Sequence, residues 1–198
     1  MLDQTYSEVL LEAASGRVVD LIREVFMVAV WDDLATYGSN IAWQLLESYV
    51  AESLQEAGDY VIRPCVGKSD ARYSQKSIVN IGGCTSKVMK SDCTAAVRDG
   101  QDRVLYYSSN RFHPLYDMIF KTGNVYYAFQ VTIGTKHKAT KAEIQKVVYT
   151  LGITNGGPEL RLVYAVHEGV FDNFVTDPTV PFAPPGVSAY HMKIGQRP

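Results

Sequence analysis

Residues Pro114 to Lys138 read PLYDMIFKTGNVYYAFQVTIGTKHK. Two runs rich in β-branched and aromatic residues flank a Gly-Asn pair, a pattern that indicates a β-hairpin. Polar residues interrupt both runs, with Asp117 in the first and Gln130 and Thr132 in the second. A hairpin used only for packing favours Val, Ile or Tyr at such places. These three polar residues are therefore candidates for function.

The register of this hairpin decides whether its polar residues meet. A two-residue turn at Thr122–Gly123 places Asp117 across from Ala128, and the strand period of two then puts all three polar residues on one face. A three-residue turn puts Gln130 on the opposite face. The functional interpretation depends on which turn forms.

Length and composition set broad limits on the rest of the chain. Its 198 residues, 46% of them hydrophobic, suffice for one compact unit with a substantial core. The formal net charge of −2 gives no overall attraction for nucleic acid, so such binding requires a local patch. Three cysteines and four histidines lack the spacing of a zinc site, and we expect the cysteines to be reduced.

No apolar run near the N-terminus is long enough to span a bilayer, and acidic residues there do not fit a signal peptide. We therefore expect an intracellular protein without a membrane partner, or one domain of a longer protein. The oligomeric state is left open.

Patterning along the chain predicts helices at both ends of a β-rich middle. We expect an N-terminal region, residues 1–37, of packing helices, and a main domain, residues 38–198, that begins with the clearest helix and ends it at Gly58. Thr140 to Glu143 is a capping box that starts a second helix, ended by Gly152. The predicted strands outside the hairpin are Tyr60–Val66, Ser77–Ile81, Lys87–Met89, Val104–Tyr107, Leu160–Val166 and Val187–Ile194.

This order predicts an α/β fold, in the α+β sense of one mixed sheet flanked by helices. Within such a fold, hydrolysis of a phosphodiester by a divalent metal needs oxygen ligands that converge at one edge of the sheet. Asp117 and Gln130 fit that need, a helix carboxylate can add a third ligand, and Lys136, His137 or Lys138 can supply charge or transfer a proton. The alternative is that Asp117 and Gln130 lie on the solvated face of an edge hairpin.

The hairpin sequence also resembles a known family. The string Pro-Leu-Tyr-Asp-Met-Ile-Phe, a short turn, Val-Tyr-Tyr-Ala-Phe-Gln-Val-Thr and a following Lys-His is similar to the nuclease core of the restriction-endonuclease-like PD-(D/E)XK superfamily. More narrowly it resembles the C-terminal domains of Crinkler effector proteins and of trypanosomatid retrotransposon hot spot proteins. The resemblance runs loosely from Gly38 to Val166, and its specific part is the hairpin.

This resemblance implies a restriction-endonuclease-like core and a nuclease that uses Mg²⁺ or Mn²⁺ to cleave nucleic acid, DNA rather than RNA. Leu46-Glu47, followed by Leu54, Gly58 and Arg63, is similar to the helix that donates a glutamate in that family. Glu47 is thereby implied as a third metal ligand beside the two hairpin residues. The resemblance further implies a secreted effector that acts in a host nucleus, or a nuclear protein.

Two positions depart from the family pattern. Gln130 stands where the superfamily has its second acidic ligand, and its amide oxygen can bind Mg²⁺ without adding negative charge. Thr132 stands at the position of the signature lysine, and Lys136 or Lys138 is the candidate replacement. We expect nucleic acid to contact the cluster made of Lys136, His137, Lys138 and Lys141; the alternative is a solvated helix entrance. A second functional hypothesis is a domain that has lost cleavage and binds nucleic acid or a host protein.

Overall fold

The computed structural model describes residues 40–65, 75–108, 113, 115–134, 136–137, 139–176 and 184–194, with the side chains of 40–45, 136, 175 and 176 excepted. The chain divides into two compact units, residues 1–42 and 43–198, and nearly all of the described residues belong to the second. The packing helices predicted before residue 38 lie outside the described residues. None of the helices described here is long and apolar enough to cross a membrane.

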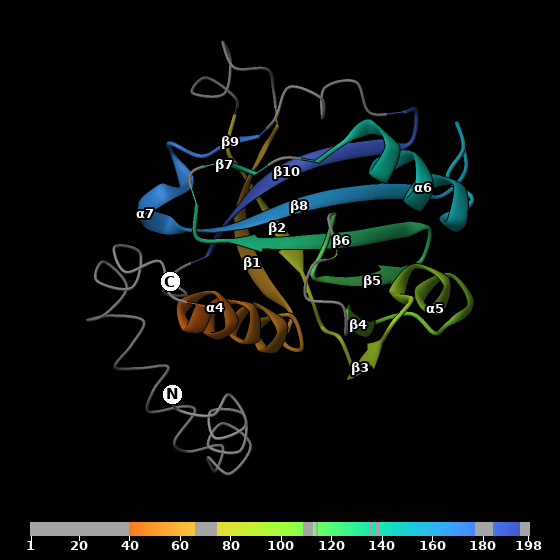
Figure 1. Cartoon of the computed structure of the whole chain (residues 1–198), viewed down its shortest axis with the longest axis horizontal. Helices are drawn as coiled ribbons and strands as arrows, with labels where there is room; N and C mark the ends of the chain where they lie inside the picture. Colours follow the sequence, from red (N-terminus) through yellow and green to blue (C-terminus); the bar gives the residue numbers. More distant parts are fainter. Residues whose placement is uncertain are drawn as a thin grey trace, which may run out of the picture. The chain divides into compact units, whose positions relative to one another are not determined.

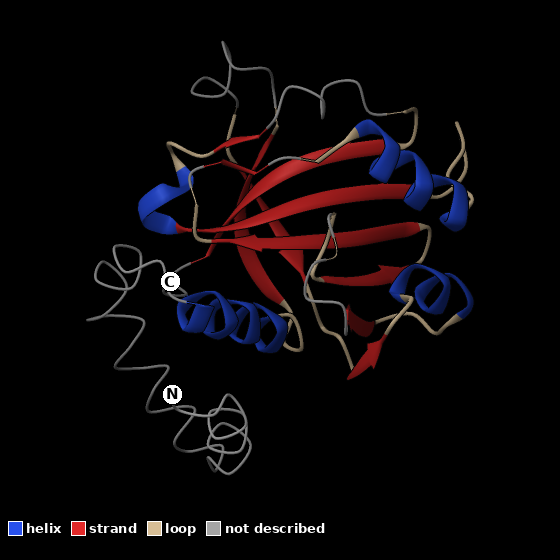
Figure 2. Cartoon of the chain, in the orientation of Figure 1, coloured by secondary structure: helices blue, strands red, loops and turns tan. Residues whose placement is uncertain are grey.

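Eight strands form one mixed sheet flanked by helices, which confirms the predicted α/β class (Figures 1 and 2). The strand order is β2-β1-β10-β8-β6-β5-β4-β3, and β7 pairs with β9 in a separate ribbon. The elements of this fold are α4 (Asn40–Ser53), β1 (Gly58–Pro64), β2 (Ser77–Ile81), β3 (Ser86–Lys90), α5 (Cys93–Asp99), β4 (Val104–Ser108), β5 (Met118–Thr122), β6 (Val125–Thr132), β7 (Lys136–His137), α6 (Lys141–Leu151), β8 (Glu159–His167), α7 (Glu168–Phe171), β9 (Val175–Thr176) and β10 (Val187–Ile194).

The three central strands of the sheet are parallel. The pairs on either side of them are antiparallel, except at one edge, where β3 pairs with β4 in parallel. β6, β8 and β10 run parallel to one another, and α6 provides the crossover that a parallel β6–β8 connection requires. On one face of the sheet, α5 and α6 cover the first half of β8, where Leu160 and Leu162 lie in the core. The second half, with Tyr164 and Val166, packs against Phe171 at the end of α7. Figure 1 shows α6 and α7 at opposite ends of β8.

Local sequence signals explain α6 well. Thr140 Oγ1 accepts from the backbone N–H of Glu143, and the Glu143 carboxylate accepts from the backbone N–H of Thr140, which completes the predicted capping box. Gly152 ends the helix at φ 68°, in the left-handed region that favours glycine. The predicted start and end of this helix are confirmed.

One helix end was predicted wrongly, and one helix was missed. α4 ends at Ser53 rather than at Gly58, because Leu54 O accepts from Cys84 N and the chain turns there; Gly58 is instead the first residue of β1. The middle of the chain, predicted as β-rich, also contains α5, whose N-cap Asp92 accepts from Ala95 N. The three cysteines are free, as predicted.

Candidate functional site

The hairpin closes at the Gly-Asn pair, one residue beyond the Thr122–Gly123 turn on which the pairing of Asp117 with Ala128 depended. Thr122 pairs with Val125, so the two turn residues are Gly123 and Asn124, and Ile119 rather than Asp117 lies opposite Ala128. Gly123 has φ 56°, a conformation that explains why glycine stands in this turn. The predicted pairing of Asp117 with Ala128 was therefore wrong.

A β-bulge directs the Asp117 side chain. Met118 is the ladder partner of Phe129, yet the backbone N–H of Asp117 also donates to Phe129 O (2.8 Å), so two residues of one strand face one residue of the other. On its other side, Asp117 O accepts from Ser108 N (3.0 Å). Bonds to β4 and β6 thus fix the Asp117 backbone just where β5 begins.

The same bulge brings Asp117 and Gln130 together. Asp117 Oδ2 accepts from the backbone N–H of Val131 (2.7 Å) and from Gln130 Nε2 (2.8 Å). Both side chains are buried, with 6% of Asp117 and 8% of Gln130 exposed. Gln130 Oε1 is also buried and has no hydrogen-bond partner. A buried amide oxygen without a donor is costly, and a bound cation would satisfy it as a hydrogen-bond donor does.

The charge of Glu47, on α4, affects the pKa of Asp117. Burial, and next the negative charge of Glu47, raise the pKa of Asp117 to about 7, while the bonds from Val131 and Gln130 oppose this shift. No Lys or Arg of the described residues is among the groups that shift this pKa. Asp117 is therefore a buried acid with a like charge nearby, an arrangement typical of functional sites.

The remaining predicted residues take separate places. Thr132, half-buried at the end of β6, accepts from Gly134 N (3.2 Å) through its hydroxyl. Lys136 lies on β7, Lys138 is outside the described residues, and Lys141 is exposed at the start of α6. His137, half-buried, packs its ring against Tyr164 with centroids 5.4 Å apart.

Beyond Gln130, polar residues continue across the sheet in what we call the polar row: Gln130, Tyr164, His191 and Arg63. Each is the register partner of the next, on β6, β8, β10 and β1, so the four side chains share one face. All four are buried. Sequence reasoning missed the functional possibility of the last three, although Arg63 and His191 show the same signal as Asp117, a polar residue within an apolar strand.

One cavity of about 170 Å³ is lined by residues of β1, β2, β6, β8 and β10, among them Tyr127, Arg161 and Tyr190. Arg161 Nη1 donates to the Tyr127 hydroxyl (3.0 Å) there. None of the predicted site residues lines this cavity, so the chemistry of Asp117 is separate from it.

Comparison of the chain with protein-family models, with curated proteins and with solved structures finds no match. Within the described ranges, no group of three or more His, Cys, Asp and Glu side chains is placed to hold a metal ion. The functional conclusion depends on the site itself.

Proposed function

We propose that this chain is a metal-dependent nuclease domain of the PD-(D/E)XK type, which hydrolyses phosphodiester bonds of nucleic acid, DNA in preference to RNA. The observation that carries the proposal is the pair Asp117–Gln130 at the start of β5, in which the Gln130 amide nitrogen donates to a buried carboxylate and the amide oxygen has no donor. Two such oxygens with a further carboxylate nearby suit a hard divalent cation.

The residues fit Mg²⁺ or Mn²⁺ by their chemistry and their charge. Asp117 and Gln130, with Glu47 as the third ligand, would hold the ion through oxygen atoms. The raised pKa of Asp117 means that this carboxylate lacks the positive charge that would stabilise it, and a divalent cation supplies that charge. When bound, such an ion lowers the pKa of a coordinated water and neutralises the charge that develops on the phosphate.

The chain's own groups do the rest. The bonds from Ser108 to Asp117 and from Asp117 to Phe129 hold the Asp117 backbone in place, and the Asp117 carboxylate accepts from the Gln130 amide nitrogen. The Gln130 oxygen would become a ligand beside Asp117 when this amide turns over. Lys136 or Lys138 stabilises the charge in place of the signature lysine. Lys141 contacts phosphate beside the N–H groups of the first turn of α6, where anions are favoured.

Thermal melting with and without metal tests this assignment. Mg²⁺ or Mn²⁺ should raise the melting temperature of the parent protein, because the ion binds the folded state alone. Asp117→Asn should abolish that rise and the cleavage of plasmid or single-stranded DNA. The matched control is Asp59→Asn, which changes an exposed carboxylate that accepts from Asn80 on the neighbouring strand. The same metal response and cleavage in all three proteins would remove Asp117 as a ligand.

A second function is a domain of the same fold that binds nucleic acid or a host protein without cleavage. It is favoured by Gln130, which adds no charge, and by Thr132, whose hydroxyl bonds to Gly134 at the position of the family lysine. This hypothesis predicts oligonucleotide or protein binding with neither cleavage nor a metal-induced rise in melting temperature. The metal titration therefore separates the two functions.

A further inference from the structure

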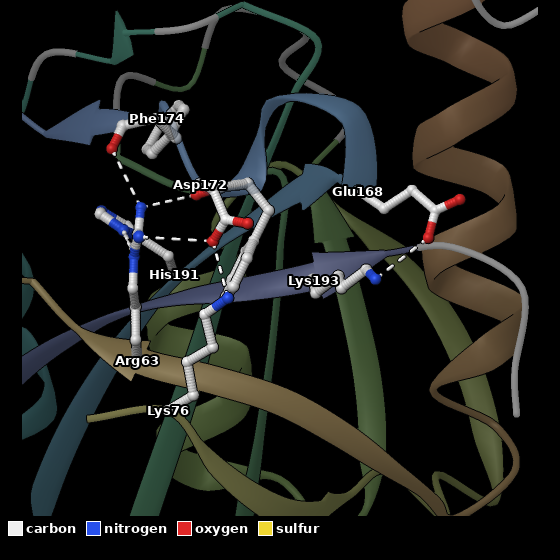
Figure 3. A network of polar contacts seen from close by, with 8 residues as sticks. Arg63, Lys76, Glu168, Asp172, Phe174, His191 and Lys193 are labelled. Carbon is white, nitrogen blue, oxygen red and sulfur yellow. Dashed lines mark hydrogen bonds and ion pairs between the residues drawn. The ribbon is translucent and has the colours of Figure 1, made fainter. Parts of the chain in front are cut away.

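The guanidinium of Arg63, at the far end of the polar row, is buried and held from several sides (Figure 3). Its Nε donates to His191 Nδ1 (3.1 Å), and its Nη2 donates to Phe171 O (2.6 Å) and Phe174 O (3.3 Å). Asp172 offers only a distant contact, 3.9 Å from Nη1, and its exposed carboxylate pairs more closely with Lys76 at 2.8 Å. The main partners of Arg63 are therefore backbone carbonyls that bracket the turn after α7.

That turn leads directly into β9. Val175–Thr176 pairs in parallel with Lys136–His137 of β7, so the chain held at Phe174 by Arg63 supports β7 from one side. β7 follows β6 after a short connection and carries residues of the predicted nucleic-acid contact.

A second set of contacts links β7 to Arg63, through the side chains of His137, Tyr164 and His191. The His137 ring packs on Tyr164 at 5.4 Å, and Tyr164 lies 6.3 Å from the ring of His191, whose Nδ1 accepts from Arg63. Arg63 is therefore connected to β7 by two routes. One runs through the carbonyls of Phe171 and Phe174 and then through β9, which pairs with β7. The other runs through His191 and Tyr164 to the ring of His137. His191 is held in the tautomer that leaves Nδ1 free to accept, because the guanidinium only donates.

We propose that Arg63 is a positioning residue for β7, and that it holds Lys136 and His137 in place for contact with nucleic acid. The nucleic-acid part of this inference rests on the proposed function. The forked, planar guanidinium is required because one group must bond two carbonyls and an imidazole at fixed angles, and an ammonium presents no such fork. The hydrogen bonds and the ion pair of Arg63 go to His191 on β10 and to residues 171, 172 and 174, and Asp117 is not among its partners.

Arg63→Lys tests the proposal, since it keeps the charge and removes the fork. Amide hydrogen exchange should rise at least tenfold in peptides that cover 136–137 and 171–176, while peptides that cover β5 and β6 stay unchanged. The matched control is Lys193→Gln, which breaks the Lys193–Glu168 pair (3.1 Å), another link between β10 and α7 that bypasses Arg63. No rise, or a uniform rise across the protein, overturns the proposal.

Binding supplies the second measurement. In buffer without divalent metal, Arg63→Lys should weaken the binding of a labelled 20-nucleotide single-stranded DNA at least fivefold, and Lys193→Gln should not. The Mn²⁺-induced rise in melting temperature should be the same in the variant and the parent, because Asp117 and its neighbours are untouched. Unchanged DNA affinity together with a loosened β7 overturns the role of Arg63 in binding.

The parent protein alone decides the case if Arg63→Lys does not fold. Segments 136–137 and 175–176 should then exchange as one opening unit in the parent, with equal free energies of opening at every denaturant concentration. Unequal openings contradict a common support. A parent that binds no DNA overturns the proposed function and the nucleic-acid part of this inference, whereas hydrogen exchange still decides whether Arg63 positions β7.

Discussion

Two buried charged residues, Arg63 and Asp117, lie at opposite ends of the polar row, and their surroundings differ in how well they stabilise the charge. Arg63 donates to two carbonyls and to His191, so its main hydrogen-bonding directions are used. Asp117 accepts two hydrogen bonds but faces the like charge of Glu47, and the amide oxygen of its neighbour Gln130 has no donor. A buried charge with complete partners serves the fold, whereas one with a like charge nearby indicates a ligand.

The largest effect on stability is expected from Arg63→Met, which removes the satisfied charge. Two carbonyls and the Nδ1 atom of His191 lose their donor in a buried place, so the free energy of unfolding should fall by about 3 kcal/mol or more. The control is Arg161→Met, because Arg161 is 31% exposed and bonds the side chains of Tyr127 and Glu159; its loss should be about 1 kcal/mol. If urea denaturation gives the same loss of unfolding free energy for Arg63→Met and Arg161→Met, the buried bonds of Arg63 contribute no more than the exposed ones of Arg161.

Asp117→Asn should instead stabilise the metal-free protein at pH 8. The pKa of Asp117 is about 7 in the folded state, above the ordinary value near 3.9, so the folded state holds a proton that the unfolded state has lost. The free energy of unfolding of the parent should therefore fall as pH rises from about 4 to 7, and the asparagine variant lacks that slope. We expect a gain on the order of 2 to 4 kcal/mol at pH 8 and less at pH 5.

The asparagine also suits its surroundings. Its oxygen can accept from Val131 N, and its amide can donate to the Gln130 oxygen once the Gln130 amide turns. Urea denaturation at both pH values measures the gain, with Asp59→Asn as a control of unchanged pH dependence. If the asparagine variant is less stable than the parent at pH 8, the buried charge of Asp117 does not lower the free energy of unfolding as proposed.

Thr132→Lys sharpens the comparison by giving the acidic end a cation. Position 132 lies two residues beyond Gln130 on β6, hence on the same side of the strand. The new charge should lower the pKa of Asp117 and raise the free energy of unfolding at pH 8 by about 1 kcal/mol. DNA cleavage should rise by about tenfold or more, because the variant restores a charge stabiliser. Thr132→Met, which adds similar length without charge, should do neither.

The smallest effect on stability per substitution is expected when the lysines beside β7 are removed. Replacing Lys136, Lys138 and Lys141 by alanine should cost about half a kcal/mol or less per lysine in unfolding experiments. DNA affinity should fall for all sequences, and the slope of log affinity against log salt should shrink by about 0.9 for each phosphate that the variant no longer neutralises. The control replaces three exposed lysines outside this cluster, Lys87 and Lys90 on β3 and Lys146 in the middle of α6. Equal slopes in the two triple variants would place the nucleic-acid surface elsewhere.

Local sequence signals determined the elements whose cause is local. The capping box and Gly152 set both ends of α6, the strand-like run Val187–Ile194 coincides with β10, and the Gly-Asn pair forms the turn between β5 and β6. The sequence analysis did not predict α5, because its seven residues make less than two full turns and give little hydrophobic periodicity. The one local signal for this helix was Asp92 as an N-cap. The sequence also singled out Asp117 and Gln130, since polar residues within apolar strands need a reason.

Tertiary structure decided how these residues meet. The bulge at Asp117 depends on bonds to both β4 and β6, and no local pattern within residues 114–138 encodes a partner such as Ser108. The polar row likewise joins β6, β8, β10 and β1, whose order in the sheet differs from their order in the chain. Cross-strand register and the burial of a charge are properties of neighbours distant in sequence. For that reason the sequence pointed to Asp117 but not to Arg63, and only the folded sheet shows that Asp117 lies near a like charge while hydrogen bonds hold Arg63.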